Sequence, residues 1–117
     1  MHDLSTLRIT LVSSDEADDR LIRRLLIEAR RPEWSFTWLR SPDAAIARLA
    51  ENDGDVMLIG EWVGRESGLE LVRQIFGRGN RCPLVMLTHD DDRERQAEAF
   101  RAGAVETLPR NGLTPEL

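Results

Sequence analysis

The chain has 117 residues, a length suited to one domain that buries roughly two-thirds of the surface its unfolded chain exposes. Apolar residues at 41% and charged residues at 32% argue against a disordered segment, and no apolar run approaches the roughly 20 residues of a membrane span. The net charge of −5 argues against non-specific nucleic-acid binding. We therefore expect a single domain over residues 1–117, located in the cytoplasm, with no direct contact with nucleic acid or membrane.

Short apolar runs occur at residues 8–12, 36–39, 56–59 and 84–87, and a weaker run occurs at 105–109. Continuous runs of this length are typical of strands that are covered on both faces, as in a parallel sheet. The segments between them have the spacing of amphipathic helices. The order of elements predicts an α/β domain in which each strand is followed by a helix and the crossovers are right-handed.

Each predicted helix has a recognisable apolar stripe or boundary. The first carries its stripe on Leu21, Ile22, Leu25, Leu26 and Ala29. The second opens with Ser41 as N-cap and Pro42 at the first helical position. The third follows the apolar residues between positions 69 and 76 and ends at the glycines of "GRGN". The fourth is "DDDRERQAEAFRAG", with acids in its first turn and Gly103 just past its end.

The C-terminal residues "NGLTPEL" resemble the opening of a fifth helix, since Thr114 precedes Pro115 and Glu116. Only one turn of this helix lies within the chain. We expect the last helix to be short or truncated, and the domain to be the N-terminal part of a longer multidomain protein.

Arginines cluster on and after the first predicted helix, at positions 20, 23, 24, 30 and 31. A solvated helix face is the favoured interpretation, and a docking patch for an acidic partner is the alternative. Cys82 is the only cysteine, so no intramolecular disulfide can form, and its apolar surroundings favour a small buried side chain.

Three stretches of the chain resemble the receiver domain of two-component response regulators. "RITLVSSDEADDRLIRRLL" is similar to the first strand and helix of the family, and "DVMLIGEWVGRESGLELVRQI" to its third strand, active-site loop and third helix. "CPLVMLTHDDDRERQAEAFRAGAVETLPR" resembles the last two strands with the helix between them. The resemblance implies a flavodoxin-like (CheY-like) doubly wound sheet of five parallel strands in the order 2-1-3-4-5, with its site at the carboxyl ends of the strands.

The resemblance also indicates which positions would carry the chemistry of the family. Two acidic residues after the first strand hold Mg²⁺ in the family, and Ser13 and Ser14 stand there. An aspartate that ends the third strand accepts the phosphoryl group, and Gly60 takes its position. A Thr or Ser that ends the fourth strand bonds a phosphoryl oxygen, and Thr88 retains this residue type. A lysine that ends the fifth strand pairs with the phosphoryl group, and Arg110 replaces it.

These replacements remove the nucleophile and both metal ligands together. Aspartyl phosphorylation needs a carboxylate nucleophile, which glycine lacks, and two neutral hydroxyls cannot replace two negative charges around Mg²⁺. The chain therefore resembles a degenerate, or pseudo-, receiver, and we expect no metal, no cofactor and no catalysis. Glu61 should point away from the pocket because consecutive strand residues face opposite ways. Arg110 is expected to pair with loop carbonyls or with an acid such as Asp15, or else to act as a fixed charge that sets one conformation.

The tryptophans and histidines have alternative interpretations. Trp38 lies in the second predicted strand and should be core, whereas Trp34 precedes it and suits the rim. Trp62 either folds over the vacated site or serves as an exposed anchor for a partner. His2 and His89 lack metal-ligand spacing and are expected to be structural or solvent-facing.

The function that this resemblance predicts is a non-phosphorylatable signalling module that acts by protein–protein contact. Its partner would be another protein, a second copy or further domains of the same chain, which in the family include sensor kinase and cyclic-di-GMP turnover domains. The candidate contact face comprises Arg95, Phe100, Thr107 and Trp62. Two alternatives remain: a phosphoacceptor receiver that uses a non-standard residue, and a flavodoxin-like domain that binds a small ligand.

Overall fold

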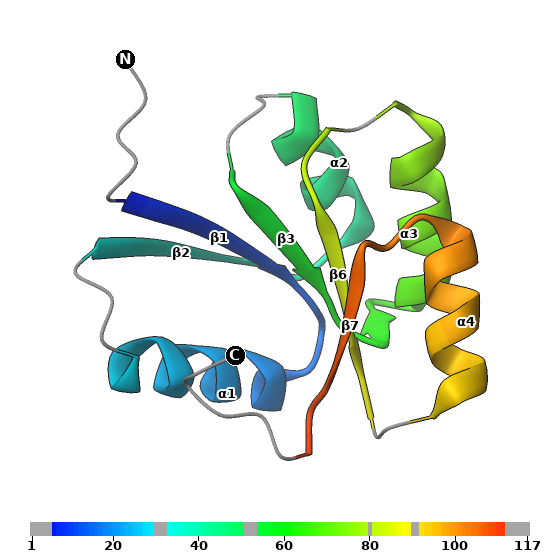
Figure 1. Cartoon of the computed structure of the whole chain (residues 1–117). Coiled ribbons are helices and arrows are strands. Elements are labelled where there is room, and N and C mark those ends of the chain that lie inside the picture. The colour runs from blue at the N-terminus through cyan, green and yellow to red at the C-terminus, as the bar shows by residue number, and fades with distance from the viewer. Residues whose placement is uncertain (1–5, 30–32, 51–53, 80, 90–91, 112–117) are drawn as a thin grey trace.

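A parallel sheet of five strands, in the order β2-β1-β3-β6-β7, forms the centre of the protein (Figure 1). The computed structural model describes residues 6–29, 33–50, 54–79, 81–89 and 92–111. The strands of this sheet are β1 (Thr6–Val12), β2 (Glu33–Leu39), β3 (Val56–Ile59), β6 (Leu84–Thr88) and β7 (Glu106–Pro109). The helices are α1 (Glu16–Glu28), α2 (Pro42–Ala50), α3 (Gly68–Gly77) and α4 (Arg93–Ala102). The strand order confirms the predicted order 2-1-3-4-5 and the flavodoxin-like fold.

The helices divide between the two faces of the sheet. Helix α1 lies on one face, and α2, α3 and α4 lie on the other (Figure 1). The three-helix face is filled by a cluster that includes Met57, Ile59, Leu71, Ile75 and Met86. The α1 face is filled by the side chains Ile9, Leu11, Ile22, Leu58, Val85 and Leu87. Strand residues alternate between the two clusters, which explains why the strands read as continuous apolar runs.

Two helix ends carry the predicted capping residues, and the start of α1 has a cap that was not predicted. The Ser41 hydroxyl accepts the Ala44 N–H at 3.2 Å and so caps α2, which begins at Pro42. Gly103 follows α4 with a φ of 123°, a conformation that side chains rarely adopt. Asp15 is the N-cap of α1 and accepts the Ala17 N–H at 2.9 Å, which fixes where the first helix starts.

A small hairpin in the loop after β3 was not predicted. Strands β4 (Trp62–Val63) and β5 (Glu66–Ser67) pair antiparallel, and Gly64 between them has a φ of 65°. Two-residue strands are too short to show an alternating pattern, so only the glycine could have indicated a turn. The predicted fifth helix at Thr114 lies outside the described residues.

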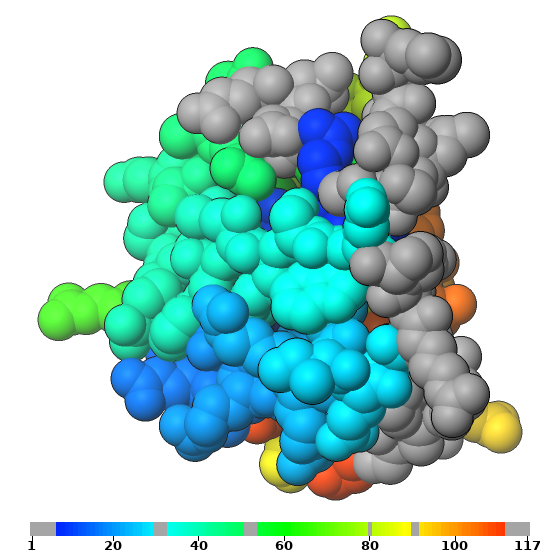
Figure 2. Space-filling view, turned by 90° about the vertical axis from the view of Figure 1, so that its left-hand side faces the viewer, coloured from blue at the N-terminus to red at the C-terminus, as the bar shows by residue number. Residues whose placement is uncertain are grey.

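Strand β2 forms one edge of the sheet and lies at the surface between α1 and α2 (Figure 2). The opposite edge is β7. Strands β1, β3 and β6 therefore lie inside the sheet, and their carboxyl ends lie side by side at the middle of one end of the sheet. Within the described part of the chain, no helix is both long enough and apolar enough to cross a membrane.

Candidate functional site

Residues predicted from four separate strands meet at one end of the sheet. Ser13 follows β1, Gly60 follows β3, Thr88 ends β6 and Arg110 follows β7. Backbone hydrogen bonds extend the sheet to this end: the Gly60 N–H donates to the Val12 carbonyl at 2.9 Å, and the Arg110 N–H to the Thr88 carbonyl at 2.8 Å. Ser13, Gly60 and Thr88 are buried there, while Arg110 is partly exposed.

Ser14 does not join this group. Its hydroxyl donates to the Trp62 carbonyl at 3.1 Å, and its N–H donates to the same oxygen at 3.0 Å. These two bonds tie the end of β1 to the β4–β5 hairpin. Of the two serines, only Ser13 faces the centre of the site.

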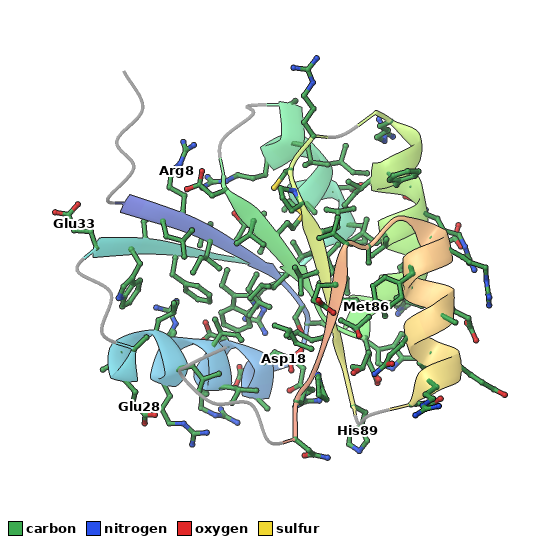
Figure 3. The ribbon with its side chains drawn as sticks, viewed as in Figure 1. Arg8, Asp18, Glu28, Glu33, Met86 and His89 are labelled. Carbon is green, nitrogen blue, oxygen red and sulfur yellow. The ribbon has the colours of Figure 1, made fainter. Side chains whose placement is uncertain are left out.

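Asp18 is the carboxylate at the centre of the site, and the sequence interpretation missed it. It lies in the first turn of α1, between the helix and the sheet (Figure 3), and its side chain is 3% exposed. The Ser13 hydroxyl donates to Asp18 Oδ2 at 2.6 Å. Asp18 Oδ1 lies 2.9 Å from Arg110 Nε. That nitrogen does not point its hydrogen at the oxygen, so within the described residues Oδ1 makes an ionic contact but accepts no aligned hydrogen bond.

Arg110 lies between two carboxylates. Besides Asp18, its Nη2 is 3.5 Å from Asp15 Oδ2. The expected pairing with Asp15 is therefore present, but the closer and more buried partner is Asp18. Through Arg110, the end of β7 is held against the start of α1.

The absence of a side chain at Gly60 makes room for this arrangement. A Cβ atom at position 60 would lie 2.7 Å from Asp18 Oδ2 and 2.7 Å from Ser13 Oγ, which is closer than real Cβ contacts come. The space that a side chain at position 60 would need is thus occupied by Asp18 and Ser13. Gly68 is required for a similar reason, because a Cβ atom at position 68 would collide with the Gly60 carbonyl oxygen. The Gly68 N–H donates to the Glu61 carbonyl at 2.7 Å.

Burial raises the pKa of the Asp18 carboxyl above its ordinary value of 3.8. The hydrogen bond from Ser13 and the positive charge of Arg110 both lower this pKa, but they do not overcome desolvation. The negative charges of Asp15 and Glu61 raise it further. Asp18 is therefore an acid whose charged form is disfavoured by its surroundings in spite of two stabilising contacts.

The position of Glu61 differs from the prediction. Its Oε1 accepts the His89 N–H at 2.9 Å, so its carboxylate reaches the loop after β6 at the same end of the sheet. The alternation rule failed because β3 ends at Ile59, and residue 61 is no longer strand. Glu61 joins two loops and lies close enough to raise the Asp18 pKa.

Of the two interpretations of Trp62, the structure contradicts the one in which the ring fills the site. Trp62 is 58% exposed, and Asp18 occupies the space instead. Trp38 is partly buried against the α1-face cluster as predicted, and its Nε1–H donates to the Ser13 carbonyl at 2.9 Å. Trp38 thus also fixes the backbone that carries Ser13.

The predicted contact face needs one correction. Arg95 and Phe100 are exposed on α4, but Thr107 is buried within β7 and cannot contact a partner. Its neighbour Met86, from β6, pairs with it in the sheet. Only Arg95, Phe100 and Trp62 of that face are available at the surface.

The residues at the metal positions implied by the resemblance do not fit Mg²⁺. Mg²⁺ binds through carboxylates and phosphate oxygens, whereas Ser13 and Ser14 are neutral and Gly60 contributes no side-chain oxygen. The nearest buried carboxylate, Asp18, already accepts from Ser13 and faces the Arg110 guanidinium. In residues 6–29, 33–50, 54–79, 81–89 and 92–111, no three His, Cys, Asp or Glu side chains are grouped so as to hold a metal ion.

A five-stranded doubly wound sheet with a polar cluster at its central strand ends defines a flavodoxin-like domain. The sequence matches the model of the response regulator receiver domain over residues 9–116. The chain therefore belongs to the response regulator receiver domain family.

Similarity to individual proteins supports the same assignment. The chain is 28% identical over 112 residues to the response regulator MprA of Mycobacterium tuberculosis, covering 96% of this chain and 47% of MprA. It is 30% identical over 93 residues to the transcriptional regulatory protein ResD of Bacillus subtilis, covering 80% of this chain and 38% of ResD. It thus spans half or less of the length of these relatives.

Solved structures share the fold. A two-component response regulator from Clostridium difficile superposes with a TM-score of 0.76 at 19% identity, covering 94% of this chain and 87% of the other. Receiver domains are signalling modules, and this one shares their architecture.

Proposed function

We propose that this domain is a receiver that signals by protein contact without being phosphorylated on aspartate. The observation that carries the proposal is that residue 60 is a glycine and that other side chains fill the space beside it. Gly60 supplies no nucleophile where the resemblance implies an acceptor aspartate, and the space beside it is filled by Asp18 and Ser13. Phosphoryl transfer to a carboxylate would need both an attacking oxygen and room for the incoming group.

Asp18 is poorly suited to replace the missing acceptor. Its side chain is 3% exposed, Oδ2 accepts from Ser13, and Oδ1 faces the Arg110 guanidinium. An oxygen must be free to approach phosphorus in line with the leaving group, and neither oxygen of Asp18 is open to solvent in this way. The donor set around it also does not fit the metal ion that neutralises a phosphoryl group.

The contact between Asp18 and Arg110 indicates how such a receiver would be fixed in one state. In a receiver that is modified, phosphorylation adds about −1.5 to −2 units of charge at the switch. Here the cation at the end of β7 already lies 2.9 Å from Asp18 Oδ1, a carboxyl oxygen of the same chain. The conformation of this end of the domain would then depend on binding partners rather than on covalent modification. The partners proposed are another protein, a second copy or an output domain of a longer chain.

The test is exposure to small phosphodonors. The protein is incubated with acetyl phosphate and Mg²⁺, and separately with beryllofluoride and Mg²⁺, beside a receiver that has an aspartate at the end of its third strand. We expect no mass gain and no change in the amide NMR spectrum, while the control receiver responds. A phosphoryl adduct on this chain would overturn the proposal, and an adduct lost in Asp18→Asn would identify Asp18 as the acceptor.

A further inference from the structure

A pocket of about 520 Å³ lies beside α1 and shares Arg110 with the site, while Gly60 is not among its lining residues. Four residues of α1 and three residues after β6 and β7 line it: Ala17, Arg20, Leu21, Arg24, His89, Arg110 and Asn111. The α1 residues are spaced by three or four, so they form one face of the helix. Helix α1 and the ends of two strands thus enclose a single concavity.

The charge of this pocket is positive in a protein whose net charge is −5. Three of its lining side chains are guanidinium groups, and none is acidic. Arg20 approaches Glu16 only at 3.7 Å, with both side chains mostly exposed, and such a pair contributes little. Within the described part of the chain, Arg24 forms no ion pair and is exposed. Arg110 is paired with Asp15 and Asp18, and Arg20 has the weak contact with Glu16, so the excess positive charge at the pocket comes from Arg24 and in part from Arg20.

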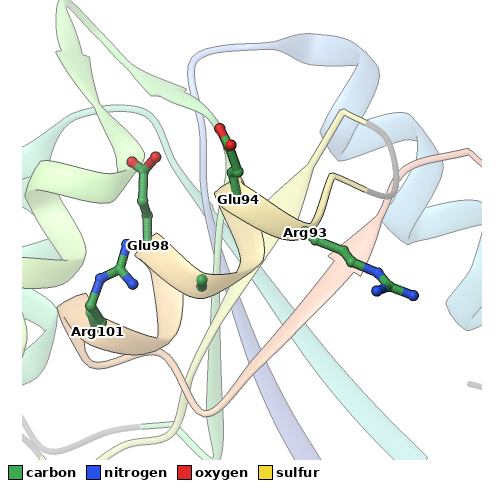
Figure 4. Close-up of a pocket in the computed structure, with 5 residues that line it drawn as sticks. Arg93, Glu94, Glu98 and Arg101 are labelled. Atoms are coloured by element: carbon green, nitrogen blue, oxygen red, sulfur yellow. The ribbon is translucent and has the colours of Figure 1, made fainter.

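A second concavity on the protein carries equal numbers of positive and negative side chains. It lies along α4, has a volume of about 410 Å³, and is lined by Arg93, Glu94, Ala97, Glu98 and Arg101 (Figure 4). Two arginines there are matched by two glutamates from the same helix turns. The α4 surface therefore has no excess of either charge that could select a ligand. The excess of positive charge at the α1 pocket is thus not shared by this other concavity.

The size and chemistry of the α1 pocket define a ligand class. Its volume is within the roughly 300–1,000 Å³ of small-molecule sites. Guanidinium groups match the geometry of phosphate oxygens, and the apolar surface of Ala17 and Leu21 suits a compact carbon skeleton beside them. We propose that this pocket binds a small molecule that carries a phosphate group. The proposal goes beyond the proposed function, because its argument does not use the residue at position 60.

Arg110 would connect such a ligand to the centre of the domain. The same guanidinium lines the pocket and lies 2.9 Å from Asp18 Oδ1. An anion in the pocket competes with Asp18 for the Arg110 guanidinium. Binding therefore changes the ionic contact of Asp18 and the hydrogen bond that the Ser13 hydroxyl donates to it. Ligand binding could in this way regulate a receiver domain that is not phosphorylated.

The experiment titrates the protein with phenyl phosphate and, in parallel, with benzoate. The buffer contains EDTA and no Mg²⁺, so that phosphoryl transfer of the receiver type cannot contribute. Binding is measured by calorimetry and by amide NMR shifts. We expect saturable binding of phenyl phosphate with shifts at Arg24, His89 and Asn111, and binding of benzoate at least about tenfold weaker because a carboxylate offers fewer oxygens and less charge.

Two matched variants separate the pocket from general attraction to cations. Arg24→Gln should weaken phenyl phosphate binding about tenfold or more without changing the melting temperature, because Arg24 is exposed. Arg101→Gln, which removes an arginine from the α4 surface, should leave the affinity unchanged. No saturable binding, equal affinity for benzoate, or equal losses in the two variants would overturn the proposal. These outcomes are independent of phosphodonor tests, so failure here leaves the proposed function standing.

Discussion

Ser13 and Asp18 share a buried hydrogen bond, in which the Ser13 hydroxyl donates to Asp18 Oδ2 at 2.6 Å. One residue follows a strand and the other is in the first turn of the next helix. Together they occupy the space beside Gly60, where a Cβ atom would be too close to both. The centre of the site is therefore built from the β1–α1 connection and not from the end of β3.

The raised pKa of Asp18 predicts a pH-dependent contribution to stability. The folded protein holds the proton of the Asp18 carboxyl more tightly than the unfolded chain does. The resulting contribution to stability is therefore fully present below about pH 3.8 and is lost as the pH rises through the raised pKa. Asp18→Asn removes the titrating group. We expect the free energy of unfolding of the wild type, relative to this variant, to be higher at about pH 3 than at about pH 7. Urea unfolding at a series of pH values measures the difference.

Asp43→Asn is a suitable control for this comparison. Asp43 is an exposed acid in the first turn of α2, so the substitution removes the same kind of charge from the start of a helix. A stability difference for Asp18→Asn that stayed constant across the pH range would contradict the assigned role of burial.

The crowding around Gly60 predicts a cost for the smallest side chain. Gly60→Ala should destabilise the protein by about 1–3 kcal/mol, because Asp18 or Ser13 must shift to admit the methyl group. Gly77→Ala is the matched control, since a Cβ there meets nothing within 4 Å and alanine favours helix. Thermal unfolding of both variants gives the comparison. Equal stability of Gly60→Ala and wild type would show that the space is open.

An aspartate at position 60 should not restore a phosphorylatable receiver. Gly60→Asp supplies a carboxylate, but its side chain meets Asp18 Oδ2 and Ser13 Oγ, and a further negative charge would lie beside Asp18. We expect a lower melting temperature and no mass gain with acetyl phosphate and Mg²⁺. A phosphorylated Gly60→Asp protein would show that the missing nucleophile is the only obstacle.

Arg110 should stabilise the fold through its buried partner. Arg110→Met leaves Asp18 buried without its cation, and we expect a loss of about 1–3 kcal/mol, reduced from that of a fully buried pair because Arg110 is partly exposed. Arg101→Met on α4 controls for removing an exposed arginine. Urea unfolding at about pH 7 measures both losses. Similar losses for the two variants would mean that the contact with Asp18 contributes nothing particular.

The fold could be predicted from the sequence because its signals are local. Continuous apolar runs marked the five strands, and Ser41 and Gly103 marked helix ends. The β4–β5 hairpin was not predicted because strands of two residues are too short to show the alternation of apolar and polar residues that indicates a strand.

Asp18 was missed for a different reason. An acid in the first turn of a helix is ordinarily explained by its favourable interaction with the helix dipole, so residue type and position alone do not indicate a buried site. The signal was nevertheless present, because Asp18 is four residues before Ile22 and seven before Leu25, in register with the buried stripe of α1. A charged residue on such a stripe needs a buried partner, and Arg110 and Ser13 are the partners that the tertiary structure supplies.

The close packing of Asp18 against Gly60 has a consequence for protein engineering. A Cβ atom at position 60 would lie 2.7 Å from both Asp18 Oδ2 and Ser13 Oγ. A single substitution at this position therefore cannot add a side chain without moving these neighbours. A variant designed to carry an acceptor there needs a second, space-making change at Asp18 or Ser13 in the same protein.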